Sequence, residues 1–343
     1  MQPVSHNTVQ LKKMNVELVK NTLKSIGVGT KASIARLTGL SVATCGTILN
    51  ELLRTGEVTE SDPEETSGGR PAKLYRFNAD YGCVACLFIR TEGGIHSIAY
   101  AVANLIGEVA EEKTLFFDSI DEGTIYGLLD AVVEQHSSVK AIGIGIPGVV
   151  QGGSIGICDV AALAGKPLGP RLKERYGVEI TIDNDMNLTV YGFYTGQNFE
   201  EQKTFAVVTF PKDHYPGAGF IVDGRILNGT TNFGGEVSYL PFGMSREEQL
   251  KLLRSGGDGF VPLVVKTLVS VIAILNPAAI ALTGDLLRPD LLQMVSEETM
   301  KEIPKAHMPE LFIQKDTRQE YVNGLISVTL ESLTYSLQLV EKR

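Results

Sequence analysis

Residues 31–55 read KASIARLTGLSVATCGTILNELLRT, which divides into two segments of helical periodicity around a tight turn, Gly39-Leu-Ser41. The Thr30 hydroxyl can cap the first segment, because a side-chain oxygen at that position accepts a hydrogen bond from an unpaired helix N–H group. The serine of the turn can cap the second in the same way, and we predict a helix from Val42 to about Arg54. Two short helices joined by such a turn are typical of a helix-turn-helix motif.

A third helix is expected before this pair. Apolar residues recur with helical spacing over 9–25, and Gly27 and Gly29 are expected to end that helix. In a helix-turn-helix domain, the N-terminal end of the last helix meets base edges in the major groove of DNA. The side chains that we expect to contact DNA here are a lysine and a group of short residues: Lys31, Ser41, Val42, Ala43, Thr44 and Thr47.

A wing is predicted directly behind this motif. Residues 57–60 alternate like a strand, and 73–77 form the expected partner strand. The loop between them contains Ser67-Gly-Gly-Arg-Pro71, whose glycines allow the backbone to run close to DNA. Arg70 is expected to enter a narrow minor groove, where the negative potential is deepest. A plain linker would have a similar composition, but its position behind a helix-turn-helix favours the wing.

The charge of the chain is distributed unevenly. Residues 1–56 contain seven Lys or Arg and two Glu, a net +5, whereas the whole chain carries −9, so the remainder carries −14. A basic N-terminal part on an acidic body is the distribution expected when only that part touches phosphates. A solvated helix face with a chance excess of lysine is the alternative interpretation.

Length and composition fit a cytoplasmic protein with a small and a larger domain. The 343 residues exceed what one small core needs, and no apolar run approaches the roughly 18 residues that cross a bilayer. The polar start of the chain lacks a signal peptide, so we expect a cytoplasmic location and no membrane partner. Cys83 and Cys86 lie on a predicted strand and therefore point to opposite faces, which favours buried thiols over a metal site.

From Asp80 onward the pattern predicts an α/β domain. We expect the following strands and helix: 84–89, 95–102, 125–135 (the helix), 139–146 and 177–182. Two of these strands end at Pro147-Gly148 and at Asp183-Asn-Asp-Met-Asn187. Because open α/β sheets bind ligands at the carboxyl ends of their strands, Gly148, Asn184 and Asp185 are candidate ligand contacts. A turn rich in Asx residues is the alternative for the second segment.

Several segments in order along nearly the whole chain carry a family resemblance: Leu37-Thr-Gly-Leu-Ser41, Ser67-Gly-Gly-Arg-Pro-Ala72, Gly143-Ile-Gly-Ile-Pro-Gly-Val149, Asn184-Asp-Met-Asn187, Gly234-Gly-Glu236 and Leu275-Asn-Pro277. Together they resemble the ROK family (repressors, open reading frames and kinases) in its repressor branch. This resemblance implies a winged helix-turn-helix over 1–78 and an actin-like ATPase (ribonuclease H-like) domain over 79–343. That domain would have two α/β lobes around a cleft, the first at about 79–187 with a returning C-terminal helix at 320–343, and the second at about 188–319.

The resemblance also assigns roles in the cleft. It places Asp185 at the catalytic base position of family kinases and Glu236 at a sugar contact. Tyr239 stands where the family has a zinc-binding histidine, and residues 240–248 contain no cysteine. We therefore expect no metal site, and we count Glu236 and Tyr239 as candidate ligand contacts together with Gly148, Asn184 and Asp185.

The phosphate-binding loops of family kinases are not matched. Their first loop resembles Asp-x-Gly-x-Thr, and the equivalent stretch, 87–93, lacks that aspartate. Their second is a Gly-x-Gly-x-Gly turn, of which 210–219 keeps only Gly217 and Gly219. Near the expected adenosine end, 282–285 holds one glycine. We therefore expect no kinase activity, no catalytic residue and no cofactor.

Three functions remain open on the sequence alone. The first is a transcriptional regulator, expected to be a repressor of carbohydrate-related genes, with a double-stranded DNA operator and a sugar or sugar-derivative effector as partners. It would act as a homodimer or homotetramer, because one helix-turn-helix reads few base pairs. The second is an ATP-dependent sugar kinase with an appended DNA-binding module, and the third is a regulator without a small-molecule ligand.

Overall fold

The N-terminal part of the computed structural model is a three-helix domain with a small sheet; the structure describes residues 8–61, 72–92, 94–196, 203–255 and 257–334. Its elements are α1 (Thr8–Ile26), β1 (Val28–Thr30), α2 (Lys31–Thr38), α3 (Val42–Thr55), β2 (Val58–Ser61) and β3 (Leu74–Phe77). The sheet order is β1-β3-β2, with both pairs antiparallel. This is a winged helix-turn-helix arrangement.

Local capping chemistry sets the ends of α2 and α3. The Thr30 side chain accepts a hydrogen bond from the Ser33 amide at 3.1 Å, while the Ser33 hydroxyl accepts one from the Thr30 amide. The Ser41 hydroxyl accepts from the Thr44 amide at 3.0 Å, and Gly39 between the helices adopts a left-handed φ of 71°. The predicted caps are therefore confirmed.

Strand β1 is a difference from the sequence prediction. Gly27 ends α1 with a φ of 73°, but Gly29 lies within β1, opposite Tyr75. A Cβ at Gly29 would lie 2.8 Å from Ile26 Cδ1. This glycine therefore allows the strand to pass close to the end of α1, and it does not terminate the helix.

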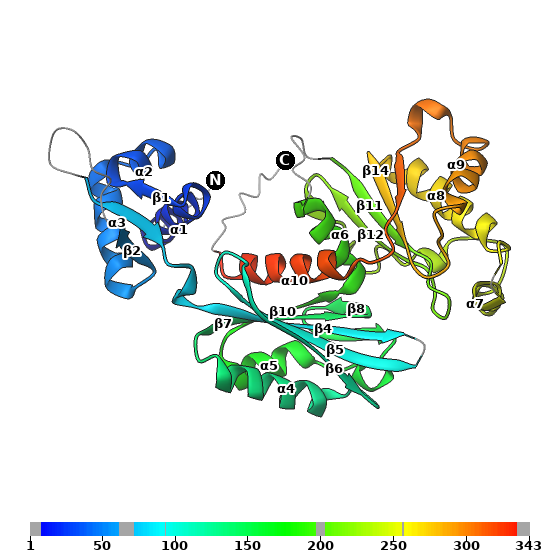
Figure 1. The fold of residues 1–343 in the computed structure, drawn as a ribbon, viewed down its shortest axis with the longest axis horizontal. Helices are drawn as coiled ribbons and strands as arrows, with labels where there is room; N and C mark the ends of the chain where they lie inside the picture. The colour runs from blue at the N-terminus through cyan, green and yellow to red at the C-terminus, as the bar shows by residue number, and fades with distance from the viewer. Residues whose placement is uncertain (1–7, 62–71, 93, 197–202, 256, 335–343) are drawn as a thin grey trace, which may run out of the picture.

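The next part of the chain, lobe 1, is built on a mixed sheet of order β10-β7-β4-β5-β6. Its strands and the hairpin beside them are β4 (Cys83–Glu92), β5 (Ile95–Asn104), β6 (Val109–Phe117), β7 (Val139–Ile146), β8 (Gly148–Gln151), β9 (Ser154–Cys158) and β10 (Glu179–Asn184). Helices α4 (Glu122–Gln135) and α5 (Leu168–Tyr176) cover one face, and α10 (Arg318–Ser332) covers the other (Figure 1).

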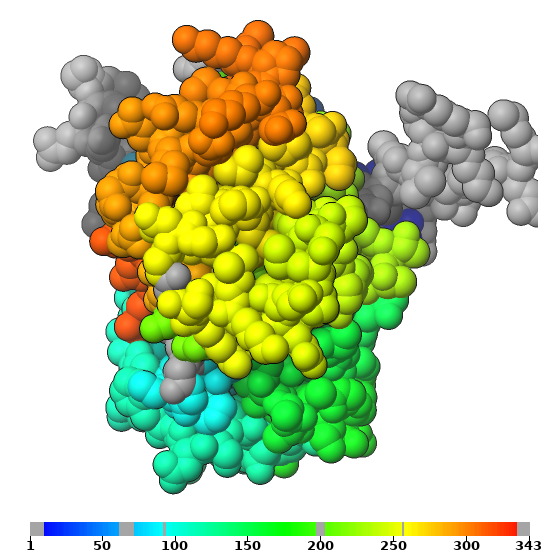
Figure 2. Space-filling view, turned by 90° about the vertical axis from the view of Figure 1, so that its right-hand side faces the viewer, coloured from blue at the N-terminus to red at the C-terminus, as the bar shows by residue number. Residues whose placement is uncertain are grey.

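Lobe 2 is built on a second mixed sheet, of order β13-β12-β11-β14-β15. Its elements are β11 (Phe205–Thr209), β12 (Gly217–Val222), β13 (Arg225–Ile226), α7 (Arg246–Ser255), α8 (Val261–Leu275), β14 (Ala279–Thr283), α9 (Leu291–Met300) and β15 (Glu310–Ile313). Helices α8 and α9 cover one face, while α6 (Asp185–Gly196) packs on the other. Figure 2 shows the outer side of this lobe, yellow to orange, above lobe 1.

Helices α6 and α10 join the two lobes. A Cβ at Gly192 of α6 would lie 1.8 Å from the Glu320 carbonyl oxygen, and a Cβ at Gly324 of α10 would lie 1.8 Å from that of Leu188. The expected lobe limit at 187/188 falls inside α6, which follows β10 of lobe 1 and packs on the sheet of lobe 2. The helix expected over 320–343 spans Arg318–Ser332, and residues 335–343 lie outside the described part of the chain.

No single helix among the described residues is long and apolar enough to cross a membrane. Helices α2 and α3 would be so only together, and they are bent by 114° at the turn between them.

We expect Gly324→Ala to destabilise the protein, because its methyl group would force α6 and α10 apart. Overpacking of this kind costs about 1–3 kcal/mol or more. Gly127→Ala in the exposed face of α4 is the matched control, since nothing lies within 4 Å of its added Cβ. It should leave stability unchanged or raise it by about 0.5–1 kcal/mol. Denaturant unfolding of both variants checks this, and equal stabilities would contradict the role given to Gly324.

Candidate functional sites

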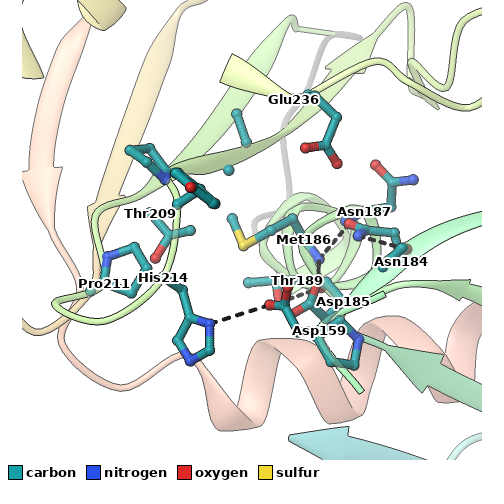
Figure 3. Close-up of a pocket in the computed structure, with 18 of the residues that line it drawn as sticks. Asp159, Asn184, Asp185, Met186, Asn187, Thr189, Thr209, Pro211, His214 and Glu236 are labelled. Carbon is teal, nitrogen blue, oxygen red and sulfur yellow. Dashed lines mark hydrogen bonds and ion pairs between the residues drawn. The ribbon is translucent and has the colours of Figure 1, made fainter. Parts of the chain in front are cut away.

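A cleft of about 460 Å³ lies between the lobes and is lined by residues of both. Lobe 1 contributes Gly148 and Asp159, the start of α6 contributes Asp185, and lobe 2 contributes His214 and Glu236. Figure 3 shows Glu236 pointing from lobe 2 toward the side where Asp185 and Asp159 lie. The five residues that the sequence indicated as ligand contacts all line this cleft.

Asn184 is held in place by the backbone around it. Its Oδ1 accepts hydrogen bonds from the amides of Met186 at 2.9 Å and Asn187 at 3.2 Å, which caps α6. Its Nδ2 donates to the Gly148 carbonyl at 3.0 Å. The Asx-turn alternative thus describes part of its role, because most of its hydrogen-bonding capacity is used to position Gly148 and Asp185.

Gly148 is required by the close approach of the β8–β9 hairpin. A Cβ at this position would lie 2.6 Å from the Ile157 carbonyl oxygen and 2.8 Å from Cys158 Cα. The absence of a side chain keeps the backbone at the edge of the cleft, where it can approach a ligand closely.

Asp185 is the most strongly perturbed carboxylate of the cleft. Burial, reinforced by the negative charge of Asp159, raises the pKa of Asp185 to about 7, and Arg90 acts in the opposite direction. Burial likewise raises the pKa of Asp159, which pairs with His214 across the cleft at 3.5 Å between Oδ2 and Nδ1 (Figure 3). A carboxyl group whose pKa is about 7 can either accept a hydrogen bond from a ligand hydroxyl or donate one to it.

Two arginines, each beside an aromatic ring, also line the cleft. Burial raises the pKa of Glu236, and the nearby guanidinium of Arg246 lowers it. Tyr239 is 51% exposed and its ring lies over Arg246, with 3.9 Å between ring centroid and Cζ. Arg90 lies over the buried ring of Tyr321 at 5.6 Å. The stretch 87–93 therefore brings a cation to the cleft.

Sequence reasoning did not identify Arg90, Asp159, His214 or Arg246. Arg90 and His214 lie in the two segments compared with kinase phosphate loops, but nothing local distinguishes them from surface charges. Asp159 is brought to the cleft by the β8–β9 hairpin, where its amide donates to the Pro147 carbonyl. These residues meet only through long-range folding, which a single sequence does not reveal.

Two of the three glycines that this chain has in the segments compared with kinase loops allow close packing. A Cβ at Gly219 would lie 2.3 Å from the Met186 carbonyl oxygen, so this glycine lets α6 approach β12. A Cβ at Gly284 would lie 2.5 Å from the backbone of Phe210. Gly217 meets only ordinary contacts with Met186 and Thr209.

Two cysteines lie in the sheet of lobe 1, away from any group of metal ligands in the described residues. Cys83 and Cys86 are buried in different clusters on the two faces of the lobe 1 sheet, as predicted. Within the described ranges, no group of three or more His, Cys, Asp or Glu could hold a metal ion.

The second candidate site is the N-terminal end of α3. Ser41, Val42, Ala43 and Thr47 are exposed there, and Thr44 is partly exposed. The Lys31 ammonium lies 5.7 Å from the Tyr75 ring and beside Gly46 of α3, so it reaches across the start of that helix. Arg70 belongs to 62–71, which lies outside the described residues.

Comparison with known families identifies the domain around the cleft. Residues 89–248 match the ROK family. The chain carries a ROK family domain. The resemblance noted in the sequence is therefore confirmed.

Relatives of this chain include repressors and kinases. It is 26% identical over 245 residues to the xylose repressor of Caldicellulosiruptor bescii, covering 68% of this chain and 60% of that protein. It is 24% identical to the xylose repressor of Bacillus subtilis, over 67% of this chain and 61% of that protein. A shorter match, 28% over 119 residues, covers 34% of this chain and 38% of the N-acetyl-D-glucosamine kinase of Haemophilus influenzae. The chain thus spans about three fifths of the length of these repressors.

Solved structures extend the likeness in fold to nearly the whole chain. A ROK family transcriptional regulator, a homologue of the E. coli MLC protein, matches 95% of this chain and 98% of its own with a TM-score of 0.69 and 17% identity. The ROK hexokinase of Thermus thermophilus matches 73% of this chain and 98% of its own, with a TM-score of 0.56 and 17% identity. At this identity the likeness shows the fold, which confirms the predicted fold class.

We expect Asp185→Asn to stabilise the protein more at pH 8 than at pH 5. In the folded state the pKa of Asp185 is about 7, whereas its ordinary value is 3.8. Stability is therefore lost as pH rises from about 4 to 7, since the folded state keeps a proton that the unfolded state has released. The pKa difference of about three units limits the loss in free energy of unfolding above pH 7 to about 4 kcal/mol.

Thermal unfolding of both proteins at the two pH values measures the difference. If the wild type and Asp185→Asn differed by the same amount at pH 5 and pH 8, Asp185 would not be the group that holds the proton.

Proposed function

We propose that this ROK chain is a DNA-binding transcriptional repressor of carbohydrate-related genes, with a small carbohydrate-like effector in the cleft. One observation carries this proposal: a winged helix is joined in one chain to a sugar-kinase-like domain. We call the exposed residues at the start of α3 (Ser41, Val42, Ala43 and Thr47) its reading surface. The xylose repressors among its relatives support the assignment.

The reading surface of α3 suits contacts to DNA through small groups. The Ser41, Thr44 and Thr47 hydroxyls can bond phosphates or base edges, and the exposed methyls of Val42 and Ala43 can contact thymine methyl groups. Lys31 and the net positive charge of residues 1–56 attract the phosphate backbone of DNA. In this proposal Arg70 reads the minor groove, and a homodimer or homotetramer pairs two half-sites.

The cleft suits a polyhydroxylated ligand. Asp185 and Glu236 offer charged or protonated carboxyl groups, Gly148 offers open backbone, and Tyr239 offers a hydroxyl. Alternating donors and acceptors of this kind match sugar hydroxyl groups. We propose Asn184 as a contact that also positions the other groups.

Phosphoryl transfer is not part of the proposal. Residues 87–93, where the family's first phosphate loop is expected, contain Arg90 and no aspartate, and an arginine cannot bind a metal ion as that aspartate would. Gly219 is closed off by the backbone of α6, and Pro211 has no amide to donate to phosphate. The shorter kinase match therefore gives less support to a kinase than the longer repressor matches give to a regulator.

A direct contact connects the DNA-binding domain to lobe 1. Tyr81, at the start of lobe 1, lies beside the C-terminal end of α3, because a Cβ built on Gly56 would be 3.7 Å from its ring. Leu105, in the turn between β5 and β6, packs against the hydrophobic core of the winged helix. Effector binding can therefore shift the equilibrium between states of lobe 1 that hold α3 differently.

We expect Thr47→Glu to weaken operator binding by roughly tenfold or more, because a negative charge on α3 would face phosphates and base edges. The same change at the exposed Thr195, at the end of α6, is the matched control and should leave binding unchanged. Anisotropy titration with the upstream DNA of the gene measures both. Binding that survives deletion of residues 1–78 would refute the DNA-binding role.

We expect no turnover when the wild type is incubated with ATP and a panel of hexoses. A sugar kinase would react at about one turnover per second or faster. Asp185→Asn should remove the response of operator binding to the effector while leaving effector-free operator affinity in place, because the cleft and α3 are separate. ATP consumption at an enzymatic rate that stops in Asp185→Asn would establish the kinase function instead.

A further inference from the structure

A guanidinium stacked on two aromatic rings forms one wall of the cleft. Arg246 Cζ lies 4.0 Å from the ring centroid of Tyr215 and 3.9 Å from that of Tyr239. The ring of Phe233 packs on Tyr239, with 5.0 Å between centroids and 60° between planes. All four residues line the cleft. We name Tyr215, Arg246 and Tyr239 the aromatic clamp.

The backbone around Arg246 is fixed on both sides. Arg246 is the first residue of α7, whose start is closed by reciprocal hydrogen bonds between Ser245 and Glu248, at 2.7 and 3.2 Å. The buried Gln249 side chain donates to the Ser238 carbonyl at 3.1 Å, which ties α7 to the turn that carries Tyr239. The aromatic clamp is therefore a preorganised feature of this wall.

One donor of the clamp, Nη1 of Arg246, is buried and has no hydrogen-bond partner in the part of the chain that the structure describes. Glu236 is near enough for its pKa to be lowered by Arg246, but no ion pair joins the two among the described residues. A buried N–H of a charged group that lacks a partner is costly. Because the rings of Tyr215 and Tyr239 lie over the guanidinium, its N–H groups can form further hydrogen bonds only in the guanidinium plane.

The geometry points to a carboxylate-binding subsite at Arg246, so that the effector is a sugar acid and not a neutral sugar. This inference rests on the proposed role of the cleft as a carbohydrate site. The edge of a guanidinium presents parallel N–H donors whose spacing matches the two oxygens of a carboxylate. The sugar hydroxyls would meet Asp185 and Glu236.

The charge of the cleft favours a carboxylate over a phosphate group. Asp159, Asp185 and Glu236 already crowd the cleft, since the pKa of Asp185 is raised partly by Asp159 and that of Glu236 partly by Asp159 as well. A phosphate monoester carries close to two negative charges at neutral pH, whereas a carboxylate carries one. A singly charged planar anion therefore meets less repulsion and fits the fork of Arg246.

Calorimetric titration of the full chain tests the inference with D-glucuronate, D-galacturonate and D-gluconate. Their neutral counterparts are glucose, galactose and the methyl ester of glucuronate, and glucose 6-phosphate supplies the phosphate arm. We expect an acid to bind at least roughly tenfold more tightly than its neutral counterpart. Arg246→Gln should remove this preference, while Arg246→Lys should keep part of it, because lysine retains the charge but not the fork.

Lys315→Gln is the control, because it removes another cation that lines the same cleft but lies outside the clamp. It should leave the acid-to-neutral ratio within about twofold, and circular dichroism and operator binding show whether each variant folds. Equal affinity for acids and neutral sugars overturns the subsite, as do tighter binding of glucose 6-phosphate and an unchanged ratio in Arg246→Gln. A lack of binding by every acid also overturns it, whereas loss of operator binding by the wild type would instead refute the proposed function.

Discussion

The close crossing of α6 and α10 is the constraint on which the rest of the structure depends. Two helices approach this closely only where neither carries a side chain, which is met here at Gly192 and Gly324. Helix α6 packs on the sheet of lobe 2, and α10 packs on that of lobe 1. The crossing therefore fixes how the lobes sit relative to each other, and with them both walls of the cleft.

The same two helices carry side chains that line the cleft at one end. At its other end, α10 contacts the turn that packs against the winged helix. Asp185 begins α6, and Tyr321, whose buried hydroxyl has no hydrogen-bond partner, lies near the start of α10 beside Arg90. Helix α10 has 15 residues and is thus about 22 Å long. Near its far end, Leu330 is the closest neighbour of a Cβ built on Gly107, in the turn whose Leu105 packs against the winged helix. In the proposed repressor, a displacement at the cleft end would reach the winged helix through this rigid helix.

The sequence predicted those features that local chemistry determines. Thr30 and Ser41 identified the starts of α2 and α3, because capping involves residues only three apart. Strand β1 was missed because it has three residues and pairs with Leu74–Arg76, more than forty positions later. The aromatic clamp was missed for the same reason: Tyr215 and Arg246 are thirty-one positions apart, and neither follows a recognised motif. In the cleft, the family pattern indicated Asp185 and Glu236, whereas Arg90 and Asp159 became visible only in three dimensions.

The clamp also holds the wall at the position where the family pattern has a metal site. In the family pattern, a histidine and cysteines would hold the segment after Glu236, and this chain has Tyr239 and no cysteine there. Here a stack of two rings on a guanidinium, a capped helix start and the bond from Gln249 to Ser238 hold the same segment. Within the described residues, this stack leaves Nη1 of Arg246 without a hydrogen-bond partner. The segment that lacks the family's metal ligands is therefore held by a side chain that places a positive charge in the cleft, so that a structural element also affects what the cleft can bind.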